Sequence, residues 1–211
     1  MRLSRAILWA VMALLSARSG HQILAEETPP AAPPPAAWIS LFNGKDLSGW
    51  KASEDVAWTV EEGKIATPPQ RSHLFTERKF KNFEFKADIM TTPGSNSGIY
   101  FHSSYENTWP THGYESQVNV SHGDPVRTGS LYNVVKLYET PAKDNEWWTQ
   151  HIIVKGKNIV VKIDGKIVVD YTEPEGVTGP RKLSEGSFAL QAHDPKSRVY
   201  YRNIMVKPLA D

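Results

Sequence analysis

The 211-residue sequence contains no cysteine. This absence excludes disulfide bonds, zinc–thiolate sites, catalytic thiols and a membrane anchor on a lipid-modified cysteine. The charges nearly cancel, with 24 basic and 23 acidic residues, so the composition gives no electrostatic case for a nucleic-acid partner, which would require a basic stripe. After residue 37 the chain also lacks any apolar pattern of helical period sustained over three turns, which excludes a helical bundle.

The first 25 residues have the pattern of a secretory signal peptide. Two arginines precede an apolar run at 6–15, and small residues follow it. The run is too short for a permanent membrane helix, and a short buried helix is the alternative. We expect cleavage after Ser19 or Ala25 and a secreted or periplasmic product without an integral membrane segment. This segment holds three of the basic residues and no acidic ones, so the rest of the chain carries a net charge of −2.

Residues 26–37 contain five prolines in twelve positions. Proline removes backbone hydrogen-bond donors and favours an extended polyproline conformation, so this stretch is predicted to be a semi-rigid tether. The remaining residues, 38–211, are numerous enough to bury one hydrophobic core. We expect them to form a single domain.

Short segments in which apolar and polar residues alternate dominate this domain. Alternate positions of 83–90 are apolar, which is typical of a half-buried strand. Glu-Gly at 62–63 and Asp-Gly at 164–165 predict tight hairpin turns between neighbouring strands. Many short strands separated by such turns predict an all-β fold, either a sandwich or a jelly roll.

One strand carries polar side chains along a whole face. Side chains alternate in an extended strand, so within 113–119 the residues Glu115, Gln117 and Asn119 point the same way. The segments 96–102 and 188–193 show related patterns, which end in histidines. Three such strands side by side would form a polar concavity of the size of a sugar. The alternative is an ordinary solvated face of an antiparallel sheet.

Several motifs in order carry a resemblance to a known family. They are FNGKDLSGW (42–50), GSNSGIYF (94–101), GYESQ (113–117), TGSLY (128–132), NEWW (145–148), QAH (191–193) and YRNI (201–204). Over residues 38–209 they resemble the 3-keto-disaccharide hydrolase domain family. The resemblance implies a concanavalin A-like β-sandwich of two antiparallel sheets that binds carbohydrate, in a secreted bacterial protein. His102 and Asn119 depart from the resembled pattern, in which Arg or another residue is expected at position 102 and Asp at position 119. These departures leave open whether the reaction differs in detail or is absent.

The resemblance also implies cleavage of 3-keto-glycosides or 3-keto-disaccharides. A ketone at C3 acidifies the hydrogen on C2, so a base can remove it and the resulting enolate can expel the group on C1. Such a site needs one general base, whereas an ordinary glycosidase places two carboxyl groups across the bond. Glu115 and His193 are the candidates for catalytic residues, since a carboxylate and a histidine can both accept a proton.

Further candidates could bind the sugar. They are Gln117, Asn119, His102, Gln191, Trp109 and Lys136. The amides can pair with vicinal hydroxyls, and the Trp109 ring can stack on a pyranose. Lys136 and Arg202 could stabilise an enolate or lie on a solvated face, and we favour the latter for Arg202. We interpret His112, His122 and His151 as loop or surface residues.

Three functions are compatible with these observations. The first is the 3-keto-glycoside-cleaving enzyme, and the second is a non-catalytic carbohydrate-binding module, since a fold alone does not decide function. The third is an ordinary glycosidase of laminarinase type, whose Glu-x-Asp-x-x-Glu run this sequence lacks. The residues leave open whether a divalent metal ion takes part, and they call for no other cofactor. They also leave the oligomeric state open.

Overall fold

The computed structural model describes residues 37–211. The predicted signal peptide and residues 26–36 of the predicted tether lie outside the described residues. The described part consists of strands and turns, and it contains no helix that could cross a membrane. Its strands are β1 (Ile39–Ser40), β2 (Trp50–Ala52), β3 (Thr59–Glu61), β4 (Lys64–Ala66), β5 (Ser72–Thr76), β6 (Phe83–Thr91), β7 (Asn96–Ser103), β8 (Tyr114–Asn119), β9 (Trp148–Lys155), β10 (Asn158–Ile163), β11 (Lys166–Thr172), β12 (Ser187–Ala192) and β13 (Val199–Pro208).

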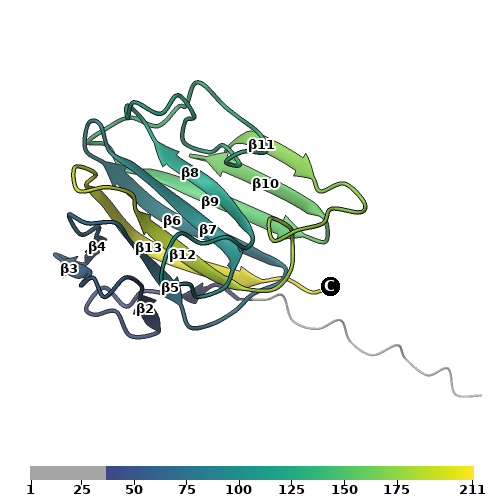
Figure 1. Ribbon diagram of the computed structural model, residues 1–211, viewed down its shortest axis with the longest axis horizontal. Coiled ribbons are helices and arrows are strands. Elements are labelled where there is room, and N and C mark those ends of the chain that lie inside the picture. Colours follow the sequence, from purple (N-terminus) through teal and green to yellow (C-terminus); the bar gives the residue numbers. More distant parts are fainter. Residues whose placement is uncertain (1–36) are drawn as a thin grey trace, which may run out of the picture. The chain divides into compact units, whose positions relative to one another are not determined.

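The strands form two antiparallel sheets that enclose the hydrophobic core, as the alternating pattern predicts (Figure 1). The larger sheet has the order β11-β10-β9-β6-β13-β4-β3, with β1 paired to β13. The smaller sheet has the order β2-β5-β12-β7-β8. The all-β sandwich is therefore confirmed for the described residues.

Two-residue turns join neighbouring strands at both predicted hairpins. Glu62 and Gly63 join β3 to β4 with φ values of 47° and 77°, and Asp164 and Gly165 join β10 to β11 with 48° and 80°. Two consecutive residues with positive φ match the type I′ turn, whose twist follows that of the strands. These turns hold the register of the larger sheet.

The smaller sheet is buried on both faces, which is unusual for an antiparallel sheet. On its inner face Ile99 and Leu190 are fully buried in the core. On its outer face Tyr100 and Gln191 are each only 2% exposed. That outer face therefore lies beneath other parts of the chain, which enclose a space between themselves and the sheet.

Candidate functional site

A cavity of about 310 Å³ lies on the outer face of the smaller sheet. Its lining consists of Asn96, Tyr100, Trp109, Glu115, Gln117, Asp124, Tyr132, Arg181, Gln191 and His193. Five of the residues predicted from the sequence, including both catalytic candidates, are thus brought together around one space. The others come from unpredicted positions on strands and loops.

The register of three neighbouring strands explains this convergence. Tyr100 on β7 pairs with Glu115 on β8, and Gly98 pairs with Gln117. Because side chains alternate, these positions share the outer face with Gln191 on β12, the strand on the other side of β7. The polar row predicted on 113–119 therefore faces the cavity in its first two members.

Glu115 is the most deeply placed carboxylate of the cavity, with 5% of the residue exposed. The amide of Gln191 donates a hydrogen bond to the Tyr100 hydroxyl at 2.9 Å and lies 3.4 Å from Glu115 Oε1. Burial raises the pKa of Glu115 to about 7, although hydrogen bonds from Tyr100 and Gln191 and the charge of Arg181 act against this rise. A carboxylate tuned in this way can both accept and release a proton near neutrality.

The amides of the cavity leave hydrogen-bonding capacity for a ligand. Gln117 Nε2 donates to Asn96 Oδ1 at 3.0 Å, which orients both side chains. Gln191 Oε1 is buried and has no hydrogen-bond partner among the described residues. Such an acceptor is unfavourable unless a donor reaches it, and a sugar hydroxyl is a suitable donor.

The Trp109 ring forms an aromatic wall of the cavity and packs against His73, a residue that was not predicted from the sequence. The Trp109 ring lies 5.3 Å from the ring of His73 and 5.5 Å from that of His193. His73 comes from β5, a strand that was not predicted, and pairs in register with Gln191. Burial lowers the pKa of His73 to about 4, against the attraction of Glu54, so the ring is neutral. His73 therefore supports the wall as an uncharged ring.

The cation at the cavity is Arg181, which lies in the connection between β11 and β12. Its guanidinium donates to the carbonyl oxygen of Pro110 at 3.1 Å and lies 5.8 Å from the centre of the Tyr100 ring. The preceding Pro180 carbonyl accepts the Gly113 amide at 3.1 Å. These bonds attach the loop to the start of β8, so a positive charge stays near Glu115.

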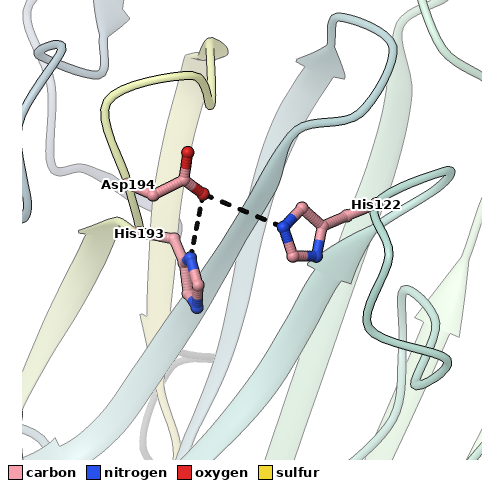
Figure 2. Close-up of side chains that lie close together, drawn as sticks. All are labelled: His122, His193 and Asp194. Atoms are coloured by element: carbon pink, nitrogen blue, oxygen red, sulfur yellow. Dashed lines mark hydrogen bonds and ion pairs between the residues drawn. The ribbon is translucent and has the colours of Figure 1, made fainter.

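His193 follows β12 and belongs to a cluster with Asp194 and His122 (Figure 2). Asp194 Oδ2 lies 3.0 Å from His193 Nδ1 and 3.9 Å from His122 Nε2. Burial alone would raise the pKa of Asp194, but hydrogen bonds from Ser197 and His193 prevail and lower it to about 2. The cluster thus joins two imidazoles to an ionised carboxylate, a set that can hold a metal ion. His122 is a loop residue, as predicted, but it contacts the site.

Asn119 lies at the end of the polar row and is not part of the cavity lining. Its amide nitrogen donates to the carbonyl oxygens of Asp124 at 2.9 Å and Val126 at 2.8 Å, and its Oδ1 accepts the His122 amide. All of these partners belong to the loop that follows β8. Asn119 therefore shapes the loop that carries His122 and Asp124.

His102 is turned away from the cavity by a β-bulge. Three steps along β7, from Tyr100 to Ser103, oppose two along β12, and His102 has a φ of 55°. A bulge interrupts the alternation of side chains, so the face that holds Tyr100 does not continue to His102. The ring instead donates from Nε2 to the Lys81 carbonyl at 2.7 Å and accepts the Ser184 amide at Nδ1.

The two basic candidates also lie outside the cavity lining. Lys136 is exposed. Arg202 lies on β13 in the other sheet, where its guanidinium is 3.9 Å from the centre of the Trp147 ring. The structure supplies Arg181 in their place. It also adds a second carboxylate, Asp124, whose position in a loop carries no periodic signal.

Comparisons with known proteins identify the family of the chain. A family model described as "3-keto-alpha-glucoside-1,2-lyase-like domain" matches residues 37–207. The chain belongs to this family. A 3-keto-disaccharide hydrolase from Bacteroides thetaiotaomicron is 32% identical over 77 residues, which cover 30% of this chain and 27% of that protein. The match therefore spans about a quarter of the length of that curated relative.

Solved structures show the same fold. A protein from Parabacteroides distasonis, described as a candidate glycosyl hydrolase, has a TM-score of 0.71 at 24% identity and covers 82% of this chain and 94% of its own. The carbohydrate-binding module CBM66 from Bacillus subtilis has a TM-score of 0.56 at 17% identity, with 75% and 95% covered. Both likenesses confirm the concanavalin A-like sandwich and, at this identity, concern the fold alone.

Proposed function

We propose that this domain cleaves 3-keto-glycosides, with Glu115 as the base that removes the proton from C2. The observation that carries the proposal is the Glu115 carboxylate itself, buried in a polar cavity of about 310 Å³ with its pKa raised to about 7. Membership of a family named for 3-keto-glucoside cleavage supports the choice of substrate. The curated relative named as a 3-keto-disaccharide hydrolase supports it as well.

The reaction follows from the acidity that a ketone confers. Glu115 takes the proton on C2, and the electron pair of that bond forms the enolate with the C3 carbonyl. When the enolate reverts to a ketone, the bond between C1 and the glycosidic oxygen breaks, a double bond forms between C1 and C2, and the leaving alcohol takes up a proton. Addition of water across this double bond completes a net hydrolysis. A base with a pKa near the working pH suits the first step.

The other cavity residues fit the remaining requirements. Arg181 is the cation placed to stabilise the negative charge of the enolate, because it is held near Glu115 by the Pro110 and Tyr100 contacts. Gln117 and Gln191 offer amides to ring hydroxyls, and Trp109 offers an aromatic surface to the pyranose. His193 is the second candidate for the base, since it lines the same cavity.

A carbohydrate-binding module is the second candidate function. It is favoured by the likeness of the fold to CBM66, a module that carries carbohydrate binding in its name. The same polar lining would serve a binding site, because amides and an aromatic wall recognise a sugar whether or not it reacts. An ordinary glycosidase needs a second carboxyl group, for which Asp124 is the residue available in the cavity.

Paired substrates separate these functions. The purified domain should release the alcohol from a 3-keto-glucoside and leave the matching glucoside intact, because the C2 proton is acidic only beside the ketone. Glu115→Gln keeps the size and hydrogen bonding of the side chain, so it should lower turnover by about 10² to 10⁴ while sparing affinity. His193→Gln is the matched variant for the second base. Binding of both sugars with turnover of neither would leave a binding module, and equal cleavage of both would indicate an ordinary glycosidase.

A further inference from the structure

The cluster of His122, His193 and Asp194 brings together three side chains of types that bind metal ions. Its three ligand atoms lie within 4.8 Å of one another, and Figure 2 shows both rings directed toward the carboxylate. Ligand atoms bound tetrahedrally to a metal at about 2.0 to 2.2 Å lie roughly 3.3 Å apart. The distance of 3.0 Å between Asp194 Oδ2 and His193 Nδ1 is close to that value. The distance of 3.9 Å between Asp194 Oδ2 and His122 Nε2 needs to shorten by less than an ångström.

The types of donor indicate which ions would fit. Two imidazole nitrogens and one carboxylate oxygen suit zinc and other divalent first-row transition metals better than calcium or magnesium, which prefer oxygen ligands. Three protein ligands leave a coordination position free, which is the arrangement of catalytic rather than structural sites. Since His193 also lines the cavity with Glu115, an ion bound here would lie at the edge of the cavity.

The carboxylate is held in place by hydrogen bonds from its neighbours, one of which reaches Oδ2, the oxygen that faces the two rings. Ser197 Oγ donates to Asp194 Oδ2 at 2.7 Å, and the amides of Lys196 and Ser197 donate to Oδ1 at 2.8 and 3.1 Å. Hydrogen bonds of this kind orient the ligands of metal sites and are costly to remove.

Two contacts oppose metal binding. The first is the 3.0 Å hydrogen bond between His193 Nδ1 and Asp194 Oδ2, which an ion bound to both atoms would replace. The second lies at His122. His122 Nδ1 accepts the backbone amide of Asp124 at 3.0 Å, so the neutral ring carries its proton on Nε2. A metal on Nε2 transfers the proton to Nδ1, where it faces the amide. The loop that contains Asp124 must therefore shift when the ion binds. Without a metal, Asp194 would accept a hydrogen bond from His193 Nδ1 and leave Nε2 of that ring free as a base.

We propose that His122, His193 and Asp194 bind a divalent transition-metal ion at the edge of the sugar cavity. The role of the ion rests on the proposed function: a Lewis acid at this position would polarise the ketone of a 3-keto-sugar while Glu115 removes the neighbouring proton. The binding of the ion does not rest on it, because the ligand geometry is independent of the substrate. The two claims can therefore fail separately.

Cobalt(II) is a direct probe, because its visible absorption reports the ligands. Untagged protein freed of metal with a chelator is titrated with Co²⁺ and, in a second experiment, with Zn²⁺ by calorimetry. We expect one ion per chain, and we expect His122→Ala and Asp194→Asn each to weaken binding by at least about 100-fold. His112→Ala is the matched control, since His112 is an exposed loop histidine paired with Glu106.

The outcomes distinguish the two claims. Binding of one ion that depends on His122 and Asp194, without cleavage of a 3-keto-glucoside, would support the metal site and overturn the proposed function. Cleavage that survives the chelator, together with Co²⁺ binding that is absent or unchanged in the variants, would overturn the metal site. Amide spectra of the 121–126 loop provide a second readout, because an ion on His122 must displace the Asp124 amide.

Discussion

Gly98 lies directly against the carboxylate of Glu115. A β-carbon at position 98 would come within 2.2 Å of Glu115 Oε1 and 2.9 Å of its Cγ and Cδ. The strand pairing explains this contact, because Gly98 is beside Tyr100 on β7, opposite the row that carries Glu115 and Gln117. The missing side chain therefore makes the space in which the carboxylate stands.

Gly98→Ala should move the Glu115 carboxylate without unfolding the domain. A displacement of about 1 Å in a reacting group can lower turnover by about 100-fold, and we expect a loss of that order for the 3-keto-glucoside. The measurement is kcat, with near-ultraviolet circular dichroism to confirm that the fold is retained. In the double variant with Glu115→Gln the alanine should cause little further loss, because both changes act on one group. Losses that multiply would show that Gly98 acts elsewhere.

Glu115→Gln should stabilise the domain at alkaline pH. Burial raises the pKa of Glu115 to about 7 from an ordinary value of 4.5, so the folded state favours the protonated form and loses stability as pH rises between these values. Glutamine cannot ionise. Relative to the wild type, the free energy of unfolding of the variant should therefore increase by on the order of 2 kcal/mol from pH 5 to pH 8.

Chemical denaturation at both pH values measures this gain. Glu77→Gln removes an exposed carboxylate and is the matched control, for which we expect almost no change. An equal gain for the two variants, or a gain for Glu115→Gln that does not depend on pH, would contradict the burial argument.

The fold could be predicted because its signals are local. Alternation in β6 and the Asp-Gly turn between β10 and β11 depend only on neighbouring residues. The strand β5 escaped prediction because all five of its residues are buried, so the outward residues do not form a polar row that marks alternation. His73 lies in this strand and was therefore not predicted either. Burial of both faces of a sheet depends on which loops cover it, and that is a tertiary property.

The candidate site could be predicted where strands supply it. Glu115, Gln117 and Gln191 were found because two-residue periodicity fixes the face on which they lie. Arg181 and Asp124 could not be found, since loop residues have no periodicity and reach the cavity through long-range contacts. His102 was predicted to bind the sugar but does not line the cavity. The bulge that turns it away has a positive φ at His102, which a pattern of apolar and polar residues does not reveal.

We propose that the chain is exported, and its N-terminus tests this. Expression of the full-length sequence in a bacterium should yield an exported protein that lacks its first 19 to 25 residues, because the apolar run at 6–15 follows a basic start. Intact mass spectrometry of the periplasmic and secreted fractions measures the cleavage. Leu14→Arg interrupts the apolar run and should retain the chain in the cytoplasm. A full-length wild-type chain found only in the cytoplasm would contradict export.

Arg181→Ala should shift the pH dependence of turnover, whereas Lys182→Ala should not. The charge of Arg181 lowers the pKa of Glu115, so its removal raises that pKa further. A base must be ionised to act, and the acid limb of kcat/KM should therefore move to higher pH by up to about one unit. The loss of activity should be greater at pH 6 than at pH 9.

Lys182→Ala makes the same change of charge one residue further along the loop, at an exposed position outside the cavity lining. A general effect of net charge would therefore move both profiles equally, whereas a direct field on Glu115 moves only that of Arg181→Ala. The loss that remains for Arg181→Ala at pH 9, where Glu115 is ionised in both proteins, measures stabilisation of the enolate. Coincident profiles of the two variants would exclude Arg181 from both roles.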